Sequence, residues 1–247
     1  MIGVEALAGL PEVDPGDDLA GLIAAAAGGR LRDDDVLVVA HKVVSKAEGR
    51  LVALDAVVPG TRAEALAVEH GKDPRHVQVV LDETAELVRS ERGVFICRTH
   101  HGFVCANAGV DASNAPPGLL VLLPRDPDAS ARALRARLRA LAGAAPAVVV
   151  ADSFGRAWRH GQVDVALGVA GLAPLDDWRG RTDSTGRELR ATWIAVADEV
   201  AAAADLARGK ASREPAVLVR GLGRHVRAQD GPGAGPLLRA PAEDLFR

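Results

Sequence analysis

An acidic residue stands where metal and phosphate chemistry would need one. Asp152 and Ser153 directly follow the apolar run 147–151, which predicts a buried strand. In open α/β sheets, ligand groups gather at the carboxyl ends of strands, and an Asp there commonly holds Mg²⁺ against phosphate. The alternative is that Asp152 only caps a turn.

A second carboxylate, Asp111, lies in the glycine-bearing loop 107–114 (NAGVDASN). The carboxylate, hydroxyl and amide groups of this loop could all face one ion or nucleotide, although an Asx-turn explains the Asp at least as well. Mg²⁺ typically takes one or two protein carboxylates plus phosphate oxygens. Two carboxylates on separate loops therefore suit a hard cation that bridges a polyphosphate.

The stretch 155–162 (GRAWRHGQ) places Arg156 and Arg159 on either side of Trp158. Two arginines around a tryptophan suit an anionic, planar ligand, through bidentate contacts and stacking. The alternative is that Trp158 covers a core edge while its arginines lie in water.

Lysine is rare in this chain: among 30 basic residues only Lys42, Lys46, Lys72 and Lys210 are lysines. Lys46 and Lys210 stand near glycines, which is compatible with neutralising a phosphate by a compact ammonium group. A solvated surface position is the alternative for each.

Several common sites are excluded. The chain has no GxxxxGK[ST], HExxH or GxSxG pattern, and the pair Gly221 and Gly223 lacks the third glycine of a Rossmann fingerprint. Adjacent residues on a strand point to opposite faces, so His100 and His101 are not expected to bind one metal. Cys97 and Cys105 have no metal-binding spacing and cannot form a disulfide framework.

Composition limits the class of protein. A chain of 247 residues with 48% hydrophobic side chains is long enough for one large domain or two small ones and is not disordered. The net charge of −3 argues against a nucleic-acid partner held by bulk electrostatics. The N-terminal residues show no basic region followed by an apolar one, as a secretory leader would, and no apolar run reaches the roughly 18 residues of a membrane span. We therefore expect a cytoplasmic protein with no membrane partner.

The elements that position these residues alternate between helix and strand. Asp14 and Pro15 predict the start of a helix that ends at Gly28. Asp126 and Pro127 predict the start of a second helix that ends at Gly143. An Ala-rich helix is expected over 189–208, and buried strands over 36–40, 119–123, 147–151 and 216–220. This pattern predicts an α+β (mixed α/β) architecture.

Two long segments, 98–118 and 152–186, are rich in Gly, Asp, Asn and Arg and are expected to be functional loops. The segment 227–235 is expected to be mobile or a linker.

Read together, these segments resemble the coenzyme F420:glutamate ligase family, the γ-glutamyl ligases that add the glutamate tail to that deazaflavin cofactor. The likeness begins at 9–19 (GLPEVDPGDDL) and runs to near the C-terminus. Its most specific stretches are 43–50 (VVSKAEGR), 101–114 (HGFVCANAGVDASN), 152–156 (DSFGR) and 161–164 (GQVD), with Trp158 and Arg159.

The resemblance implies a fold of the family's own, neither P-loop nor Rossmann, in which residues 1–247 form two interleaved α/β subdomains and 227–247 a tail or linker. It implies a homodimer that uses GTP as co-substrate, two Mg²⁺ or Mn²⁺ ions, and K⁺. By position, Asp111 and Asp152 match carboxylates that hold a divalent ion, and Ser153 matches a hydroxyl at the second ion. The positions that match GTP contacts are Leu10, Pro11, Glu12, Val13, His41, Lys46, Asn114, Gly209, Lys210, Ala211 and Ser212. Substrate contacts are expected from Arg156, Trp158 and Arg159.

The chain departs from the family pattern at three positions. His41 replaces a frequent Ser that contacts the nucleotide, and His160 replaces a frequent Asn. Lys210 falls where some members offer a glutamine oxygen to the second metal, and an ammonium group cannot be a metal ligand.

The implied reaction is glutamate addition to the terminal carboxylate of the F420 precursor (F420-0 or its dehydro form), followed by γ-linked glutamates. The carboxylate attacks the γ-phosphoryl group of GTP, and the glutamate amine then displaces phosphate from the acyl phosphate. No covalent nucleophile is needed, because phosphoryl transfer depends mainly on positioning and charge neutralisation.

Two rival functions remain open: a related ligase with another carboxylate acceptor, and a non-catalytic nucleotide-binding module that assists a reductase. The ending 242–247 (AEDLFR) resembles the junction at which some relatives continue into a flavin-binding nitroreductase-like domain. The chain is therefore expected to be either a stand-alone ligase or one half of a longer protein.

Overall fold

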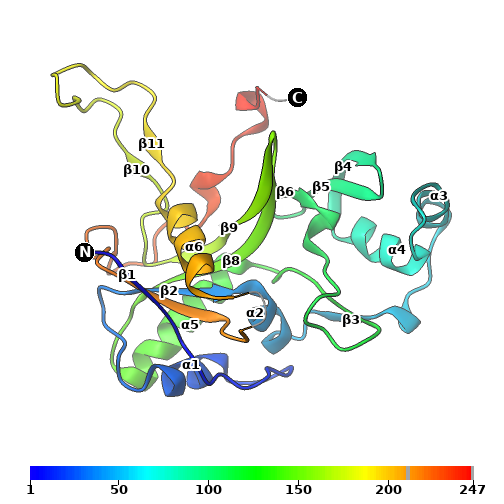
Figure 1. Ribbon diagram of the computed structural model, residues 1–247, viewed down its shortest axis with the longest axis horizontal. Helices are drawn as coiled ribbons and strands as arrows, with labels where there is room; N and C mark the ends of the chain where they lie inside the picture. The colour runs from blue at the N-terminus through cyan, green and yellow to red at the C-terminus, as the bar shows by residue number, and fades with distance from the viewer. Residues whose placement is uncertain (210–211, 246–247) are drawn as a thin grey trace.

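A five-stranded sheet forms the centre of the structure, a computed structural model that describes residues 1–209 and 212–245 (Figure 1). The strands lie in the order β1-β12-β2-β8-β9. β2 and β8 run parallel, and the other neighbouring pairs run antiparallel. The strands span Gly3–Ala6 (β1), Val36–Ala40 (β2), Ala147–Arg156 (β8), Arg159–Ala170 (β9) and Ala216–Arg220 (β12).

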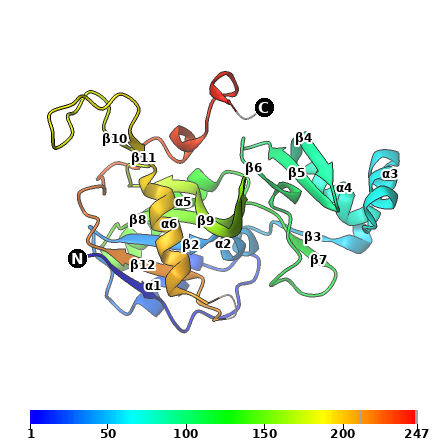
Figure 2. The ribbon, with the colours of Figure 1, turned by 45° about the horizontal axis from the view of Figure 1, so that its top comes forward.

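Helices cover both faces of this sheet (Figure 2). On one face lie α1 (Leu19–Ala27) and α5 (Pro127–Ala142), and on the other lies α6 (Val196–Ala207). Along β2, Leu37 belongs to the core that includes α1 and α5, whereas Val38 belongs to the core that includes α6. Both faces of the strand are buried, so its sequence is a continuous apolar run rather than an alternating one.

The chain between α2 (His41–Ala47) and α5 builds a second lobe beside the sheet, at the right of Figure 1. It holds the helices α3 (Thr61–His70) and α4 (Pro74–Asp82) and the short 3₁₀ turns η1 (Leu54–Ala56) and η2 (Asn107–Gly109). Its strands are β3 (Leu51–Ala53), β4 (Thr84–Glu91), β5 (Val94–Thr99), β6 (Val104–Ala106) and β7 (Leu119–Val121). A separate apolar core around Phe95 and Leu120 stabilises this lobe.

The β8–β9 hairpin extends beyond the sheet and packs against the second lobe. The Phe103 ring meets the Phe154 ring edge-on, with their centroids 6.4 Å apart, in a small cluster that includes Leu123 and Leu167. The hairpin therefore lies between the sheet and the second lobe.

An arm and a C-terminal segment complete the described chain. Residues 176–194 project away from the second lobe as an arm whose base pairs β10 (Asp176–Asp177) with β11 (Trp193–Ile194) (Figure 1). The 3₁₀ turns η3 (Gly235–Leu237) and η4 (Pro241–Glu243) lie near the C-terminus. Across residues 1–209 and 212–245, no helix is both long and apolar enough to span a bilayer.

Several predicted elements are confirmed, including the mixed α+β class. The strands over 36–40 and 216–220 have the expected bounds. The helix predicted after Asp126 begins there, because the Asp126 carboxylate accepts the Ala129 N–H (2.8 Å), and it ends at Gly143 with φ 72°.

Other predictions were wrong. The N-cap of α1 is Asp18, which accepts from Gly21 N (3.2 Å), rather than Asp14. The helix expected over 189–208 begins only at Val196, because the preceding residues complete the arm. Most of the expected loop 152–186 is the β8–β9 hairpin and its continuation into the arm.

The segment expected to be mobile, 227–235, is held against α5. The buried Arg135 guanidinium donates to the carbonyl of Arg227 (2.7 Å) and to the carboxylate of Asp230 (2.7 Å). The carboxylate of Asp128 accepts the Ala234 N–H at 2.9 Å. These contacts contradict the expectation that this segment is mobile.

Candidate functional site

Four chain segments meet at one edge of the central sheet. β2 ends beside β8, and Ala40 opposite Ala151 is the last pair of their parallel ladder. β12 begins at the same edge, where Ala40 N donates to Pro215 O (2.8 Å), and Leu7 N donates to Ala216 O (2.8 Å). The residues that follow β1 and β2, those that precede β12 and the part of β8 beyond Ala151 therefore lie in a common place, as expected for a ligand site of an open sheet.

The two predicted carboxylates both approach the first residues of α2. The Asp111 Oδ2 atom lies 2.6 Å from Lys42 Nζ. The Asp152 Oδ1 atom lies 3.3 Å from His41 Nε2. Because His41 and Lys42 are consecutive residues, the structure brings Asp111 and Asp152 to one corner of the sheet edge.

The electrostatics of this corner keep both acids ionised. Burial raises the pKa of the Asp152 carboxyl, but attraction to His41, a backbone hydrogen bond and attraction to Lys42 outweigh it, and the pKa lies below its usual value. Burial opposes ionisation of Asp111 in the same way, and hydrogen bonds from Lys42 and Ser113 lower its pKa. The Lys42 ammonium thus acts on both carboxylates, as a cation between them would.

His41 is 2% exposed in its side chain and has an unusual environment. Within the described ranges, neither ring nitrogen has a hydrogen-bond partner, since the approach to Asp152 lacks hydrogen-bond geometry. An unsatisfied buried polar atom is costly, so the unpartnered His41 ring beside Asp152 makes this corner a candidate place for a ligand.

The loop that carries Asp111 is fixed at both ends. Asp111 N donates to Val121 O (3.0 Å), and Val121 N donates to Asp111 O (2.8 Å). Ser113 N and Ser113 Oγ donate to the two carboxylate oxygens at 2.7 Å and 2.8 Å. The Asx-turn considered from the sequence is therefore present, and it orients the carboxylate toward Lys42.

Ser153 points away from Asp152, because neighbouring residues of a strand face opposite sides. Its hydroxyl donates to Asp164 Oδ1 (2.6 Å) on β9. The fully buried Asp164 also accepts from Arg208, the residue that follows α6. Burial raises the pKa of the Asp164 carboxyl in spite of the Arg208 charge.

The residues that match nucleotide contacts lie around this edge, although not all side chains are available to a ligand. Leu10 and Val13 are buried in the core with α1, whereas Pro11 and Glu12 are exposed. Glu12 forms an ion pair with Lys46, whose side chain is only 8% exposed.

Of the other predicted nucleotide positions, Asn114, Gly209 and Ser212 lie outside helices and strands. Asn114 is exposed and has a left-handed backbone with φ 57°. Ser212 Oγ donates to Gly209 O at 2.9 Å. Lys210 and Ala211 lie outside the described residues.

The predicted substrate residues lie at the tip of the β8–β9 hairpin. Arg156 pairs with Arg159 at the last position of the ladder, and Arg156 donates to His160 O (2.7 Å). Trp158 is 78% exposed and has a left-handed backbone with φ 60°. The structure therefore does not bury Trp158 against a core edge, which was the alternative from the sequence.

Sequence reasoning missed the roles of Lys42, Asp164 and Arg208. The sequence marks Lys42 only as a rare lysine and Asp164 only as the last residue of the stretch 161–164, which resembles the family. In the part of the chain that the structure describes, no group of three or more His, Cys, Asp and Glu side chains could hold a metal. A cation at the Asp111–Asp152 corner would therefore need ligands from a bound molecule.

Known proteins resemble this chain over almost its whole length. A family model described as F420-0:Gamma-glutamyl ligase matches residues 9–221. A coenzyme F420:L-glutamate ligase of Methanopyrus kandleri is 49% identical over 238 residues, which cover 96% of this chain and 94% of the relative. The protein of the same name in Methanothermobacter thermautotrophicus is 46% identical, and the match covers 100% of this chain and 98% of the relative. The one in Haloarcula marismortui is 45% identical, and the match covers 99% of this chain and 95% of the relative.

The class of protein that these matches define is a ligase with a mixed α+β fold. More specifically, the chain belongs to the F420-0:gamma-glutamyl ligase family.

Proposed function

We propose that this protein is a GTP-dependent ligase that adds L-glutamate to the terminal carboxylate of the coenzyme F420 precursor and then extends the tail by γ-linked glutamates. The observation that carries the proposal is the convergence of Asp111 and Asp152 on His41 and Lys42. The names of the curated relatives support the acceptor and the amino acid.

The corner fits a divalent cation. Its donors are carboxylate and hydroxyl oxygens, which Mg²⁺ and Mn²⁺ prefer, and the Lys42 ammonium already holds a positive charge between the acids. Two carboxylates leave room for phosphate oxygens as further ligands. We propose that Asp111 and Asp152 hold this ion and that Ser153, whose side chain faces the other side of β8, serves a second one. When bound, such ions neutralise charge on the transferring phosphoryl group.

The chain's own residues bind and orient the reactants. Lys46, Gly209 and Ser212 contact the nucleotide, together with the exposed Pro11, Glu12 and Asn114. Lys46 exchanges its Glu12 partner for a phosphate oxygen, which a point-like ammonium group does readily. The backbone of Leu10 and Val13 supplies the remaining contacts, since their side chains are in the core.

The chemistry is a balanced pair of displacements. An oxygen of the acceptor carboxylate attacks the γ-phosphorus of GTP, and the bond to the GDP oxygen breaks. The glutamate amine then attacks the acyl carbon, the bond to phosphate breaks, and the amine loses a proton. The residues named here accelerate both steps by alignment and charge compensation, without a covalent enzyme intermediate.

The acceptor lies along β8 in this proposal. Asp152 and Arg156 are four positions apart on one strand, which is about 13 Å at the rise of an extended chain. An elongated deazaflavin can therefore place its carboxylate at Asp152 and its ring against Trp158, with Arg156 and Arg159 near its phosphate.

The family resemblance supports further parts of the proposal. We propose a cytoplasmic homodimer whose sheet and second lobe act as one ligase domain, with K⁺ as an activator and a nitroreductase-like domain or protein as a functional partner.

Incubation with GTP, Mn²⁺, L-glutamate and F420-0, followed by mass spectrometry, tests the proposal. We expect a glutamyl mass increment on F420-0 and one GDP per bond. GTP binding without GDP release would favour the non-catalytic module, and GDP formation without the increment would favour another acceptor.

A further inference from the structure

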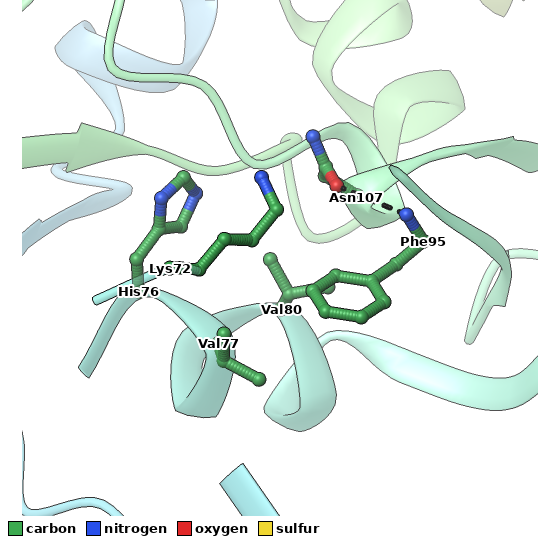
Figure 3. Close-up of a pocket in the computed structure, with 6 residues that line it drawn as sticks. All are labelled: Lys72, His76, Val77, Val80, Phe95 and Asn107. Atoms are coloured by element: carbon green, nitrogen blue, oxygen red, sulfur yellow. Dashed lines mark hydrogen bonds between the residues drawn. The ribbon is translucent and has the colours of Figure 1, made fainter. Parts of the chain in front are cut away.

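The two halves of the candidate site are held in place in different ways. On the Asp111 side, Asn107 of η2 lies beside Lys72 and His76 of the second lobe, and the space between these side chains has no room for a water molecule (Figure 3). This half is therefore held by close packing. The other half, which carries Ser153, depends instead on a buried carboxylate.

That carboxylate belongs to Asp164, which lies directly opposite Ser153 in the β8–β9 ladder and has a fully buried side chain. Ser153 Oγ donates its only proton to Asp164 Oδ1 (2.6 Å), so toward any other group the hydroxyl oxygen acts as an acceptor or a metal ligand. Ala151 and Ala166, two positions away on the same strands, belong to the core that includes α6, so this pair faces α6. Asp164 thus fixes the direction in which the Ser153 oxygen points.

The other Asp164 oxygen, Oδ2, accepts from Arg208, the C-cap residue of α6. The Arg208 guanidinium also lies 3.7 Å from the Asp205 carboxylate, and its side chain is only 12% exposed. Gly209 follows directly in the chain, and Gly209 and Ser212 are two of the positions that match nucleotide contacts. One carboxylate therefore holds both the proposed ligand of the second ion and the residue that precedes the nucleotide positions.

Stability alone does not explain a charge pair in this place. A buried ion pair contributes little compared with apolar side chains of the same volume, because both ions lose their hydration. Within residues 1–209 and 212–245, Arg208 Nη1 is buried and has no hydrogen-bond partner, which adds a further cost. What the pair with Asp164 provides is a fixed geometry, since it ties β9 to the end of α6 at one point.

We propose that Asp164 is a positioning residue that holds the Ser153 hydroxyl and the backbone at Gly209 in a fixed relation, so that the second ion and the nucleotide meet a preformed arrangement. This inference rests on the proposed function and deepens it. Asp164 acts through its neighbours, because its two oxygens accept from Ser153 and Arg208. Replacement of a carboxylate that orients a metal ligand typically changes metal affinity about 10- to 100-fold.

Calorimetric titrations of Asp164→Asn with GDP and with Mn²⁺ test the proposal. The amide keeps the volume and an acceptor for Ser153 but does not balance the Arg208 charge. Without metal, we expect Kd for GDP to rise about tenfold or more, because the backbone at Gly209 must then be ordered on binding. At saturating GDP, affinity for the second Mn²⁺ should fall about 10- to 100-fold.

The double variant Arg208→Met with Asp164→Asn separates positioning from stability, because it leaves neither charge buried without a partner. It should unfold near the wild-type temperature and still bind GDP about tenfold or more weakly. Wild-type affinity for GDP in this folded variant would overturn the proposal.

Asp198→Asn is the matched control. Asp198 is a half-buried acid that also joins α6 to β9, since it accepts from Ala166 N (2.9 Å), but it lies ten positions before Arg208, which is about 15 Å along a helix. This variant should keep the wild-type Kd for GDP. An equal loss of GDP affinity in Asp198→Asn would show that any weakened contact between α6 and β9 has the same effect, and would overturn the role of Asp164.

Hydrogen exchange in the protein without ligands separates this inference from the proposed function. Ser212 N donates to Gly209 O (3.2 Å), and this amide should exchange about tenfold or more faster in the double variant and at the wild-type rate in Asp198→Asn. Faster exchange in a protein that binds no GDP and glutamylates no F420 precursor would refute the proposed function and keep the structural link from Asp164 to Gly209. Unchanged exchange together with unchanged GDP affinity in an active ligase would refute the link alone.

Discussion

Trp158 at the tip of the β8–β9 hairpin gives the sharpest prediction, because its replacement should change stability and acceptor binding in opposite directions. A left-handed backbone costs a non-glycine residue roughly 1–2 kcal/mol, and Trp158 has φ 60°. Trp158→Gly removes this cost and gives back about 0.5–1 kcal/mol through the greater entropy of glycine in the unfolded chain. The free energy of unfolding should therefore stay the same or rise by about 1 kcal/mol.

Acceptor binding should weaken in the same variant. Stacking of a planar ring on an aromatic side chain contributes about 1–3 kcal/mol, which corresponds to an increase of about 5- to 150-fold in KM for the F420 precursor. KM for GTP should change by less than about twofold, since the nucleotide residues lie at the sheet edge rather than at the hairpin tip.

The assay measures both Michaelis constants and the thermal midpoint of the same preparations. Trp193→Ala is the matched control, because Trp193 is also an exposed indole (48%) that stacks with an arginine, at 4.1 Å, but it belongs to the arm. A precursor KM within about twofold of wild type, with a folded protein, would refute the placement of the acceptor along β8.

Three further predictions concern the fold that holds the site. Gly168→Ala should unfold at a clearly lower temperature in calorimetry, because its Cβ would overlap the Pro127 carbonyl, a clash that costs typically about 1–3 kcal/mol; an unchanged midpoint would contradict the close approach of β9 and α5. Arg208→Met should lower the free energy of unfolding in urea by about 3–5 kcal/mol, because it leaves the buried Asp164 carboxylate without its ion-pair partner. Adding Asp164→Asn should recover most of this loss, whereas additive losses would argue against the ion pair. Burial and the Asp152 charge raise the pKa of the Cys105 thiol to about 12, above its reference value of 9.0, so this thiol should resist alkylation at neutral pH in the folded protein. The protein should also lose stability as pH rises above about 9, where only the unfolded thiol ionises. Cys105→Ala should reduce that loss without abolishing it, because burial also raises the pKa of the Cys97 thiol, and a pH-independent stability would contradict the burial.

The parts of the fold that the sequence predicts well are those whose signals are local. β2 and β12 are apolar runs buried on both faces, and α5 has an Asp-Pro start and a terminal glycine. The second lobe has weaker signals: β4 alternates irregularly between half-buried and exposed residues, so no strand period stands out. α6 begins later than predicted because the residues before Val196 complete the arm. The Ala-rich sequence favours helix strongly, so local propensity extends the predicted helix into those preceding residues.

The same difference between local and non-local signals holds for the candidate site. Asp111 and Asp152 could be chosen from residue type, position after a strand and resemblance to a family. The role of Lys42 could not be predicted, because it depends on the approach of the second lobe to α2. This approach brings Lys42 into contact with Ser113, which is 71 residues away in the sequence. The pairing of Asp164 with Arg208 likewise spans 44 residues and two separate elements. Such contacts are set by tertiary packing, and no local pattern encodes them.

The most direct test of the account is a measurement of Mn²⁺ binding in the presence of GDP, monitored through the electron paramagnetic resonance signal of the free ion. If Asp111 and Asp152 hold the same cation, Asp111→Asn and Asp152→Asn should each weaken binding by about tenfold or more, and the double variant should be little worse than either, because neighbouring residues that share a ligand are not additive. Wild-type affinity in either single variant, or losses that simply add, would show that the two carboxylates do not act on one ion.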